Sequence, residues 1–407
     1  MVGVGGGIAA YKVCEVVRRL VESGHSVRVV PTESALRFVG AATWAALSGE
    51  PAPFSMWDDV HEVAHVRLGR DADLILVAPA TAELLAKAAG GFADDLLTAT
   101  LLTARCPIVF APAMHTEMWE HPATRANVAT LRSRGAVVVE PAVGRLTGPD
   151  SGPGRLPAPD ALAMLARRAL ARGIAGLATD LAGRRVVVSA GGTREHLDPV
   201  RFLGNRSSGR QGYALAAAAV ARGADVTLVA ANVTLPDPAG ARLVRVTSAA
   251  ELHDAVLAAA PGADAVVMAA AVADFRPAEQ LPDKIKKDPD GGVPPPVALV
   301  RTDDVLSELT GKAAEPGRMV VGFAAETGGS GRDVLALGRE KLTRKGADLL
   351  VVNEVGESLG FDAADNAAVV LGADGSETVV PRGPKDALAD VVWDLVVARL
   401  VPTDTAR

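Results

Sequence analysis

The chain has 407 residues, of which 49% are hydrophobic and only 3% aromatic, and its formal net charge is −6. This length predicts two or more domains, each able to bury its own core. The negative charge and the lack of a long basic run exclude nucleic acid and anionic membranes as main partners. Two cysteines give no disulfide framework and are typical of a reducing cytosol, so we expect a cytoplasmic protein.

The first half of the chain alternates between strands and helices. The opening strand, residues 1–4, is short, which favours additional residues upstream of this sequence. A helix follows, because Val13, Val16, Val17 and Leu20 recur at helical spacing. Further buried strands are predicted at 26–31, 72–81, 106–114 and 135–142. Strands that alternate with helices predict a parallel sheet covered on both faces.

A change of character marks the end of the first domain. Residues 143–158 are rich in glycine and proline and almost free of apolar side chains, which predicts a surface loop or flap. A helix is predicted over 159–172, and a short linker follows it. We place the domain boundary after Gly183, which gives domains 1–183 and 184–407.

The second half restarts the same alternation. Strands are predicted at 186–193, 224–231, 263–272, 319–327 and 347–355, and helices at 213–223, 249–260 and 385–400. Residues 273–296 form a polar, proline-rich excursion, and 367–380 a hairpin turned at Asp374 and Gly375. Pro261 and Asp264 interrupt an apolar run, which argues against a membrane span. The sequence therefore predicts two Rossmann-like α/β domains.

Glycines follow the first strand of each predicted sheet. Gly191, Gly192 and Thr193 precede a long polar connection and then a helix, an order that suits a bound phosphate but also an ordinary strand-to-helix turn. Gly5–Gly7 is out of register with the dinucleotide fingerprint, and no acidic residue ends the next strand. A mononucleotide is therefore favoured. Hydroxyl groups at strand ends are suitable donors, or simple helix caps: Thr32, Ser34 and Thr81.

His61, Glu62 and His65 fit the zinc-protease pattern HExxH. We reject zinc because that pattern needs a sustained helix and a third ligand, whereas this segment is expected to run directly into the strand at 72–81. His65 remains of interest, because it precedes a sheet strand and histidine titrates near neutral pH. A packed or exposed structural histidine is the alternative.

Several lysines lie close to strand ends in the second half. Lys284 belongs to a Lys-Ile-Lys-Lys run in the polar excursion, and Lys341 and Lys345 precede the strand at 347–355. Converging lysines suit a triphosphate, whose charge must be neutralised during attack at phosphorus, although basic loops are often only solvated. Three aspartates are candidate ligands for Mg²⁺: Asp274, Asp303 and Asp304.

At these residues the chain resembles the bifunctional phosphopantothenoylcysteine decarboxylase/phosphopantothenate–cysteine ligases of coenzyme A biosynthesis. The resemblance covers almost the full length. It is carried in the first half by GGGIAAYK, AHVRLGRDADLILVAPATAE, PAMHTEMW and GPGRL. In the second half it is carried by SAGGTREHLDPVRFLGNRSSG, AAAVADFRP, KIKK, GFAAET and KLTRKGADLLVVNEV.

For the second half the resemblance implies a CTP-dependent ligase. The carboxylate of 4′-phosphopantothenate is activated to an acyl-cytidylate, and cysteine then displaces CMP. Asn205 matches the asparagine of the N-x-S-S-G motif, tied to the acyl-cytidylate step, and Lys284 would offset triphosphate charge. The nucleotide-binding positions matched are Ala270, Asp274, Lys284, Asp303, Phe323, Lys341 and Lys345.

For the first half the resemblance implies a flavodoxin-like, FMN-dependent cysteine decarboxylase in which His65 matches the catalytic histidine. The flavin supplies the redox chemistry and the protein orients it. The implied FMN-binding residues are Gly6, Gly7, Ile8, Thr32, Ser34, Thr81 and Asp94. The family further implies trimeric flavin halves and dimeric ligase halves, which together make a homo-dodecamer.

The chain departs from this family at two positions. His115 replaces the substrate-binding asparagine of the PxMN motif, and histidine can still donate to a carboxylate. The flap cysteine that donates a proton is absent, and Thr147 lies near its place with a far weaker acid. An alternative therefore stays open, in which the ligase is active and the flavin-binding half has lost decarboxylation.

Overall fold

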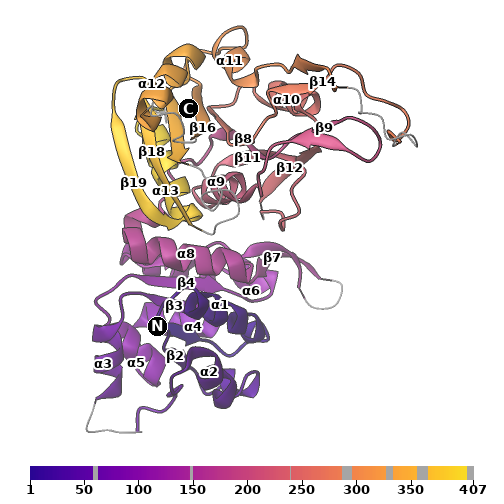
Figure 1. Ribbon diagram of the computed structural model, residues 1–407. Coiled ribbons are helices and arrows are strands. Elements are labelled where there is room, and N and C mark those ends of the chain that lie inside the picture. The colour runs from indigo at the N-terminus through magenta and orange to yellow at the C-terminus, as the bar shows by residue number, and fades with distance from the viewer. Residues whose placement is uncertain are drawn as a thin grey trace. The chain divides into compact units, whose positions relative to one another are not determined.

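The computed structural model describes residues 1–57, 63–146, 150–238, 240–286, 296–326, 333–354 and 365–400. The chain divides into two compact units, Met1–Ala178 and Thr179–Arg407, each with its own α/β layers (Figure 1). The division falls between Ala178 and Thr179 rather than after Gly183. Leu181 explains the difference, because its fully buried side chain belongs to the core of the second unit.

The sheet of the first unit has five strands in the order β2-β1-β3-β4-β5, all parallel. They are β1 (Val2–Val4), β2 (Val29–Pro31), β3 (Ile75–Ala80), β4 (Ile108–Pro112) and β5 (Val137–Val138). This is the flavodoxin-like order, whose direction reverses between β1 and β3. The prediction of a flavodoxin-like sheet is confirmed.

Helices cover both faces of this sheet because its strands are apolar on both sides. Leu76 and Ala78 face a core shared with α1 and α8, whereas Ile75 and Val77 face a core shared with α4, α5 and α7. The helices are α1 (Ala10–Glu22), α2 (Ala41–Ser48), α3 (Ala64–Asp71), α4 (Ala82–Gly90), α5 (Leu96–Thr103), α6 (Thr116–Glu120), α7 (Pro122–Ser133) and α8 (Pro159–Arg172).

The sheet of the second unit has eight strands in the order β12-β11-β8-β13-β16-β17-β18-β19. The first six pair in parallel in the Rossmann order, and β18 and β19 continue the sheet antiparallel. They are β8 (Arg185–Gly191), β11 (Asp225–Ala231), β12 (Ala241–Val246), β13 (Ala265–Met268), β16 (Met319–Glu326), β17 (Leu349–Glu354), β18 (Asp365–Gly372) and β19 (Glu377–Pro384). The direction in which successive strands are added to the sheet reverses between β8 and β13, which are themselves parallel.

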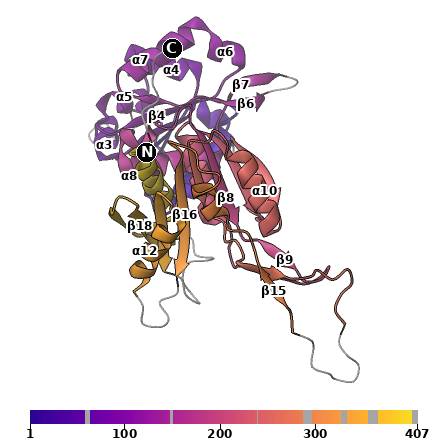
Figure 2. The same cartoon turned by 90° about the horizontal axis from the view of Figure 1, so that it is seen from above.

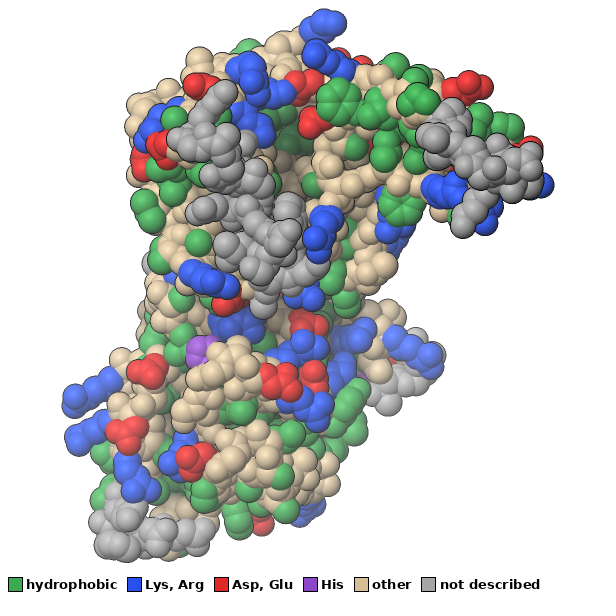
Figure 3. Space-filling model, viewed as in Figure 1, with side chains coloured by type: hydrophobic (Ala, Val, Ile, Leu, Met, Phe, Trp, Pro, Cys, Tyr) green, Lys and Arg blue, Asp and Glu red, His purple; other side chains and the backbone are tan. Residues whose placement is uncertain are grey.

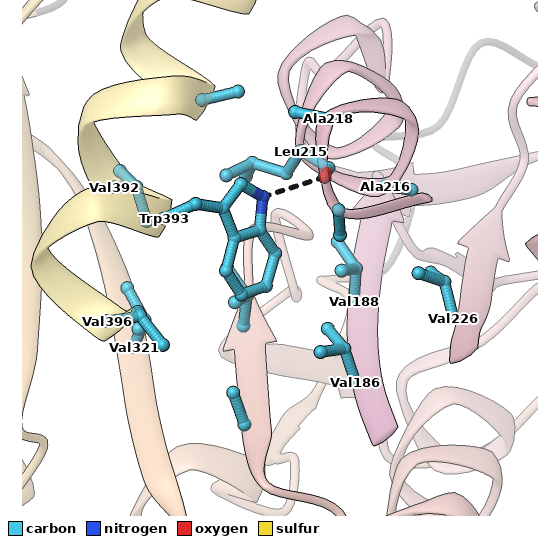
Figure 4. Packing of buried hydrophobic residues seen from close by; sticks show 14 of the residues in the cluster. Val186, Val188, Leu215, Ala216, Ala218, Val226, Val321, Val392, Trp393 and Val396 are labelled. Carbon is cyan, nitrogen blue, oxygen red and sulfur yellow. Dashed lines mark hydrogen bonds between the residues drawn. The ribbon is translucent and has the colours of Figure 1, made fainter. Parts of the chain in front are cut away.

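The largest core of the second unit lies between its sheet and two helices. Trp393 is fully buried there, packs beside Val188, and donates its indole N–H to the carbonyl oxygen of Leu215 at 2.9 Å (Figure 4). This bond fastens the last helix of the chain to the first helix of the unit. The helices are α9 (Arg210–Ala221), α10 (Ala249–Ala259), α11 (Val305–Thr310), α12 (Val334–Lys345) and α13 (Lys385–Val397).

Three short antiparallel hairpins replace segments that the sequence predicts as loops. They are β6 (Ala142–Arg145) with β7 (Ser151–Arg155), β9 (Arg194–His196) with β10 (Phe202–Gly204), and β14 (Phe275–Pro277) with β15 (Leu299–Arg301). Figure 2 shows β9 and β15 on an arm that extends from the body of the second unit, and β9 contacts β14. The predicted polar connection after β8 is therefore half of this arm.

Within the described ranges, no helix is both long and apolar enough to span a bilayer. The apolar run that the sequence shows at 255–275 is divided among the end of α10, strand β13 and the start of β14. This agrees with the expectation drawn from Pro261 and Asp264.

Candidate active sites

The glycine turn of the first unit lies where the strand order reverses. Gly5 donates its N–H to the carbonyl oxygen of Pro79 at 3.1 Å, which ties the turn to the end of β3. A Cβ atom on Gly6 would lie 2.4 Å from the Cβ of Ser34, so the turn also presses on the segment after β2. Helix α1 starts directly after the turn and has no side-chain cap. This arrangement suits an anion, because amide groups at a helix start favour negative charge.

One of the predicted hydroxyl donors caps a helix, since Thr81 accepts a hydrogen bond from the N–H of Leu84 at 3.2 Å and is the N-cap of α4. Thr32 accepts one from the N–H of Ala35 at 3.2 Å, but Ser34 is the N-cap of the short 3-10 helix Ala35–Arg37 and makes no side-chain cap. The capping interpretation is thus confirmed for Thr81 alone, and the hydroxyls of Thr32 and Thr81 keep their own hydrogens for donation. Ile8 is 67% exposed beside the turn. Gly6, Gly7, Ile8, Ser34 and Thr81 therefore lie together, whereas Thr32 ends β2 next to them.

Asp94 lies elsewhere. It follows the end of α4 that is opposite Thr81, and a nine-residue helix spans about 13 Å. Its carboxylate accepts from the ammonium of Lys87 at 2.9 Å, and this bond lowers the pKa of Asp94. Within one chain, the structure does not bring Asp94 to the glycine turn.

His65 lies in the first turn of α3, so the expectation that this segment runs straight into a strand is wrong. The carbonyl oxygen of His65 accepts from the hydroxyl of Thr103 at 2.8 Å, which joins α3 to α5. His61 and Glu62 lie outside the described residues. The described residues contain no cluster of three or more histidine, cysteine, aspartate or glutamate side chains that could hold a metal.

The flap is a hairpin seated on the turn after β4. Met114 donates its N–H to the carbonyl oxygen of Gly154 at 2.9 Å. The imidazole Nδ1 of His115 then lies 3.9 Å from a carboxylate oxygen of Asp150, with both side chains about half exposed. The flap thus brings an acidic group to His115. Thr147 lies outside the described residues.

The glycine turn of the second unit is used internally. Gly192 donates its N–H to Ala231, and Thr193 donates to Ala271, at 3.1 and 3.2 Å. The hydroxyl of Thr193 also accepts from the N–H of Ala273 at 3.0 Å. The amides of Gly192 and Thr193 are therefore occupied within the protein, and the predicted phosphate would have to bind at the start of the following helix instead.

A cavity of about 820 Å³ lies instead at the carboxyl edge of β13, β16 and β17, beside the start of α9. In the space-filling view of Figure 3 the second unit is hollowed, and basic and acidic side chains lie near the rim. The cavity gathers nearly all the predicted ligase residues, which are Asn205, Ala270, Asp274, Asp303, Asp304, Phe323, Lys341 and Lys345. This edge is where open α/β sheets bind ligands.

Asn205 connects the segment after β8 with the segment after β13, the two strands between which the strand order reverses. Its Nδ2 group donates to the carbonyl oxygen of Val272 at 2.9 Å, across the gap between the segments that follow β8 and β13. Gly209 then adopts φ +77° and starts α9, which has no side-chain cap. The start of this helix forms one wall of the cavity and is suited to an anion.

Asp304 and Lys345 form an ion pair on the opposite wall. Asp304 also caps α11 by accepting from the N–H and hydroxyl of Ser307 at 3.1 and 2.8 Å. Burial raises the pKa of Asp304, but the bonds from Lys345 and Ser307 outweigh it, and the pKa is lowered. The carboxylate of Asp304 is therefore ionised, and its oxygens are already hydrogen-bonded within the protein. Asp274 and Asp303 also line the cavity, but neither of them caps a helix.

Asn353 lines the cavity and was missed by the sequence analysis. Its Oδ1 atom is buried and has no hydrogen-bond partner. In the parallel register it pairs with Ala325, so its side chain shares a sheet face with Phe323. A polar residue at the carboxyl end of an apolar strand is the signal that could have identified it.

Lys284 does not line this cavity. It is exposed on the arm, and the next residue, Ile285, donates its N–H to the carboxylate of Asp198 at 3.1 Å. The predicted convergence of lysines therefore holds for Lys341 and Lys345 within one chain, and Lys284 lies apart from them.

Known proteins resemble this chain over nearly its whole length. Residues 1–170 match the family described as Flavoprotein, and 181–400 match the DNA/pantothenate metabolism flavoprotein C-terminal domain. The Coenzyme A biosynthesis bifunctional protein CoaBC of Mycolicibacterium smegmatis is 59% identical over 99% of this chain and 98% of that protein. The protein of the same name from Bacillus subtilis is 42% identical over 93% of this chain and 91% of that protein.

Two solved structures match one unit each. A crystal structure of the C-terminal domain of a CoaBC protein is 31% identical and covers 54% of this chain and 97% of that one, with a TM-score of 0.45. The FMN-dependent cysteine decarboxylase SpaF is 36% identical and covers 42% and 95%, with a TM-score of 0.36. From the full-length relatives and the two family matches, the chain belongs to the CoaBC family, and it is a bifunctional decarboxylase and ligase of coenzyme A biosynthesis.

Proposed function

We propose that the second unit joins 4′-phosphopantothenate to cysteine at the expense of CTP, and that the first unit uses FMN to decarboxylate the product to 4′-phosphopantetheine. We assign these two activities to the two compact units, Met1–Ala178 and Thr179–Arg407, for which the sequence predicts the domain bounds 1–183 and 184–407. The observation that carries the ligase assignment is the cavity at the strand reversal, where Asn205, Asp274, Phe323 and a lysine pair meet. Such a mixture of groups suits a nucleotide and a second anion together.

The ligation has two displacement steps. The carboxylate of 4′-phosphopantothenate attacks the α-phosphorus of CTP and pyrophosphate leaves. The amine of cysteine then attacks the acyl carbon, the acyl–oxygen bond breaks, and CMP leaves. Lys341 and Lys345 offset the negative charge of the triphosphate from the cavity wall, and the start of α9 supplies backbone amides. Lys284, which lies apart from this cavity within one chain, adds its charge from a partner chain of the oligomer proposed below. Asn205, held by Val272, orients the acyl-cytidylate.

We propose Asp274 and Asp303 as the protein ligands of a magnesium ion. Mg²⁺ typically takes one or two carboxylates and completes its shell with water and substrate phosphates, so two carboxylates in the cavity wall fit it. Asp304, predicted as a third ligand, is better explained as the cap of α11 and the partner of Lys345.

In the first unit we propose that the glycine turn and the start of α1 hold the phosphate of FMN. Gly6, Gly7, Ile8, Thr32, Ser34 and Thr81 surround this position. When bound, the flavin accepts and returns the electrons that make loss of carbon dioxide possible. His115, beside Asp150, donates to the substrate carboxylate, and His65 is the catalytic histidine. Asp94 and Thr147 stay predictions from the resemblance.

Two variants test this assignment against each other. Lys284→Ala should abolish CTP-dependent ligation, measured as pyrophosphate release, and spare carbon dioxide release from 4′-phosphopantothenoylcysteine. His65→Asn should do the reverse. Loss of both activities in either variant would contradict two separate sites. A flavin-loaded wild-type protein that never releases carbon dioxide would leave the ligase alone.

We further propose a cytoplasmic homo-oligomer in which trimers of the first unit and dimers of the second build a dodecamer. The size of the particle in solution, measured by light scattering, tests this. A stable monomer would contradict it.

A further inference from the structure

A buried carboxylate on the arm holds the backbone next to Lys284. Asp198 lies in the turn between β9 and β10, and its side chain is fully buried. One carboxylate oxygen accepts from the N–H groups of Val200 and Arg201 at 2.7 and 2.8 Å, which closes the turn. The other oxygen accepts from the N–H of Ile285 at 3.1 Å.

A second bond fixes the other end of the same segment. Leu281 donates its N–H to the carbonyl oxygen of Leu197 at 2.9 Å. The lysine loop, residues 281–286, is therefore attached at two places to the turn 197–201, with Lys284 between them. Burying a charged carboxylate is costly unless it is hydrogen-bonded. The bond from Ile285 to Asp198 therefore stabilises the contact between the turn and the lysine loop.

The charge state of Asp198 matches this arrangement. Burial raises the pKa of Asp198, but the N–H groups of Ile285, Val200 and Arg201 outweigh burial and lower it. The ionised carboxylate accepts hydrogen bonds at both oxygens and donates none. An amide of the same shape could not accept from Ile285 while it still accepts from Val200 and Arg201.

We propose that Asp198 is a positioning residue for Lys284 in the ligation reaction. This inference rests on the proposed role of Lys284 at the triphosphate. An exposed lysine side chain is long and mobile, so ordering it at a ligand costs conformational entropy. Fixing the backbone on both sides of Lys284 removes part of that cost before the ligand binds. The long connection after β8 then has a function, because its turn, residues 197–201, holds the loop that carries Lys284.

Asp198→Asn in the full-length, flavin-loaded protein tests the proposal. The substitution keeps the shape of the side chain and places an amide NH₂ against the N–H of Ile285. We expect kcat/KM for CTP in ligation to fall by about tenfold, the effect of losing one hydrogen bond to a charged group. Decarboxylation should be unchanged. Asp283→Asn, which removes the same charge from an exposed position in the lysine loop, should leave ligation unchanged.

A double variant separates positioning from general damage. If Asp198 acts through Lys284, then Asp198→Asn should weaken CTP binding in the wild-type background but cause no further weakening when it is added to Lys284→Ala, with both measured by calorimetry. An equal loss in both backgrounds, or full activity of Asp198→Asn, would overturn the proposal. If Lys284→Ala itself retains ligation, the proposed role of Lys284 fails, and that outcome is distinct from a failure of Asp198 alone.

Discussion

Both units place glycines after the first strand of a parallel sheet, yet they use them differently. In the first unit, Gly5–Gly7 leads directly into α1, although Gly5 and Gly7 donate their N–H groups to the carbonyl oxygens of Pro79 and Gly5 at 3.1 and 3.0 Å. In the second unit, the N–H groups of Gly192 and Thr193 bond within the protein, and α9 begins only after an excursion to the arm. The candidate anion site therefore lies at the start of α1 in the first unit and at the start of α9 in the second.

The difference teaches that the next helix start, rather than the glycine turn itself, marks the candidate anion site, because turn amides of both units bond within the protein. The strand reversal is the feature that the two units share, between β1 and β3 in one and between β8 and β13 in the other. Sheet order therefore indicates the candidate site of each unit more directly than glycine content does.

The first test of this comparison is to destabilise the second unit alone. Arg222 ends α9, is 2% exposed, and bonds to Asp180 at 2.8 and 2.5 Å and to Asp394 at 3.0 Å. We expect Arg222→Met to lower the free energy of unfolding of the second unit by about 3 kcal/mol, because it removes a buried cation shared by the partly exposed Asp180 and Asp394 and by the buried Asp390. Urea unfolding followed by fluorescence measures the loss, and flavin absorbance reports the first unit. Joint unfolding of both units would contradict their independence.

A second test adds a side chain to the glycine turn of the first unit. Gly6→Ala places a Cβ atom 2.4 Å from the Cβ of Ser34, and we expect it to lower the stability of this unit by about 1–3 kcal/mol and to reduce bound flavin. Gly40→Ala, outside this turn, is the matched control, since a Cβ atom there would meet no atom within 4 Å and its φ of −68° suits any residue. Flavin content of the purified variants measures both. Equal flavin loss in the two variants would contradict the steric explanation.

A third test concerns Asn353 in the cavity of the second unit. We expect Asn353→Leu to raise the free energy of unfolding by about 1 kcal/mol, because it removes a buried oxygen without a partner. The same variant should weaken ligation, because that oxygen lies in the cavity wall. Thermal unfolding and pyrophosphate release measure the two effects. A less stable but fully active variant would show that Asn353 serves the fold alone.

The smallest expected effect is a pH dependence of the wall that carries Asp303. Hydrogen bonds to Glu308, and next to Asp254, raise the pKa of His253. This bridge between α10 and α11 is fully stabilising below the unfolded pKa of about 6.5 and is lost as pH rises through the higher folded value. His253→Gln should therefore cost about 1 kcal/mol or less at pH 5.5 and nothing at pH 9. A cost that grows with pH would contradict this sign.

The strands of both sheets could be predicted because their residues are buried on both faces and form apolar runs. The small hairpins could not, since Phe275, Leu299 and Val300 are exposed and give no alternation of burial. Helix α3 was missed for a related reason. Of its eight residues only Gly69 is buried, so the helical spacing is weak.

The site residues divide in the same way. The ligase residues near strand ends, such as Asp274 and Phe323, could be expected to meet, because parallel strands present their carboxyl ends at one edge. The position of Lys284 could not be predicted, because it depends on a bond between two hairpins that are far apart in sequence. The occupation of the turn at Gly192 depends likewise on partners beyond the local sequence.

The flap of the first unit rests on two glycines. A Cβ atom at Gly152 would lie 2.4 Å from the hydroxyl oxygen of Thr116, and Gly154, at φ +145°, would place one 2.2 Å from the carbonyl oxygen of Met114. The second strand of the hairpin is thus pressed flat on the protein, while Val143 on the first strand is 75% exposed. The outer strand therefore has room for larger side chains, whereas a side chain at Gly152 would have to displace Thr116 and one at Gly154 would meet backbone.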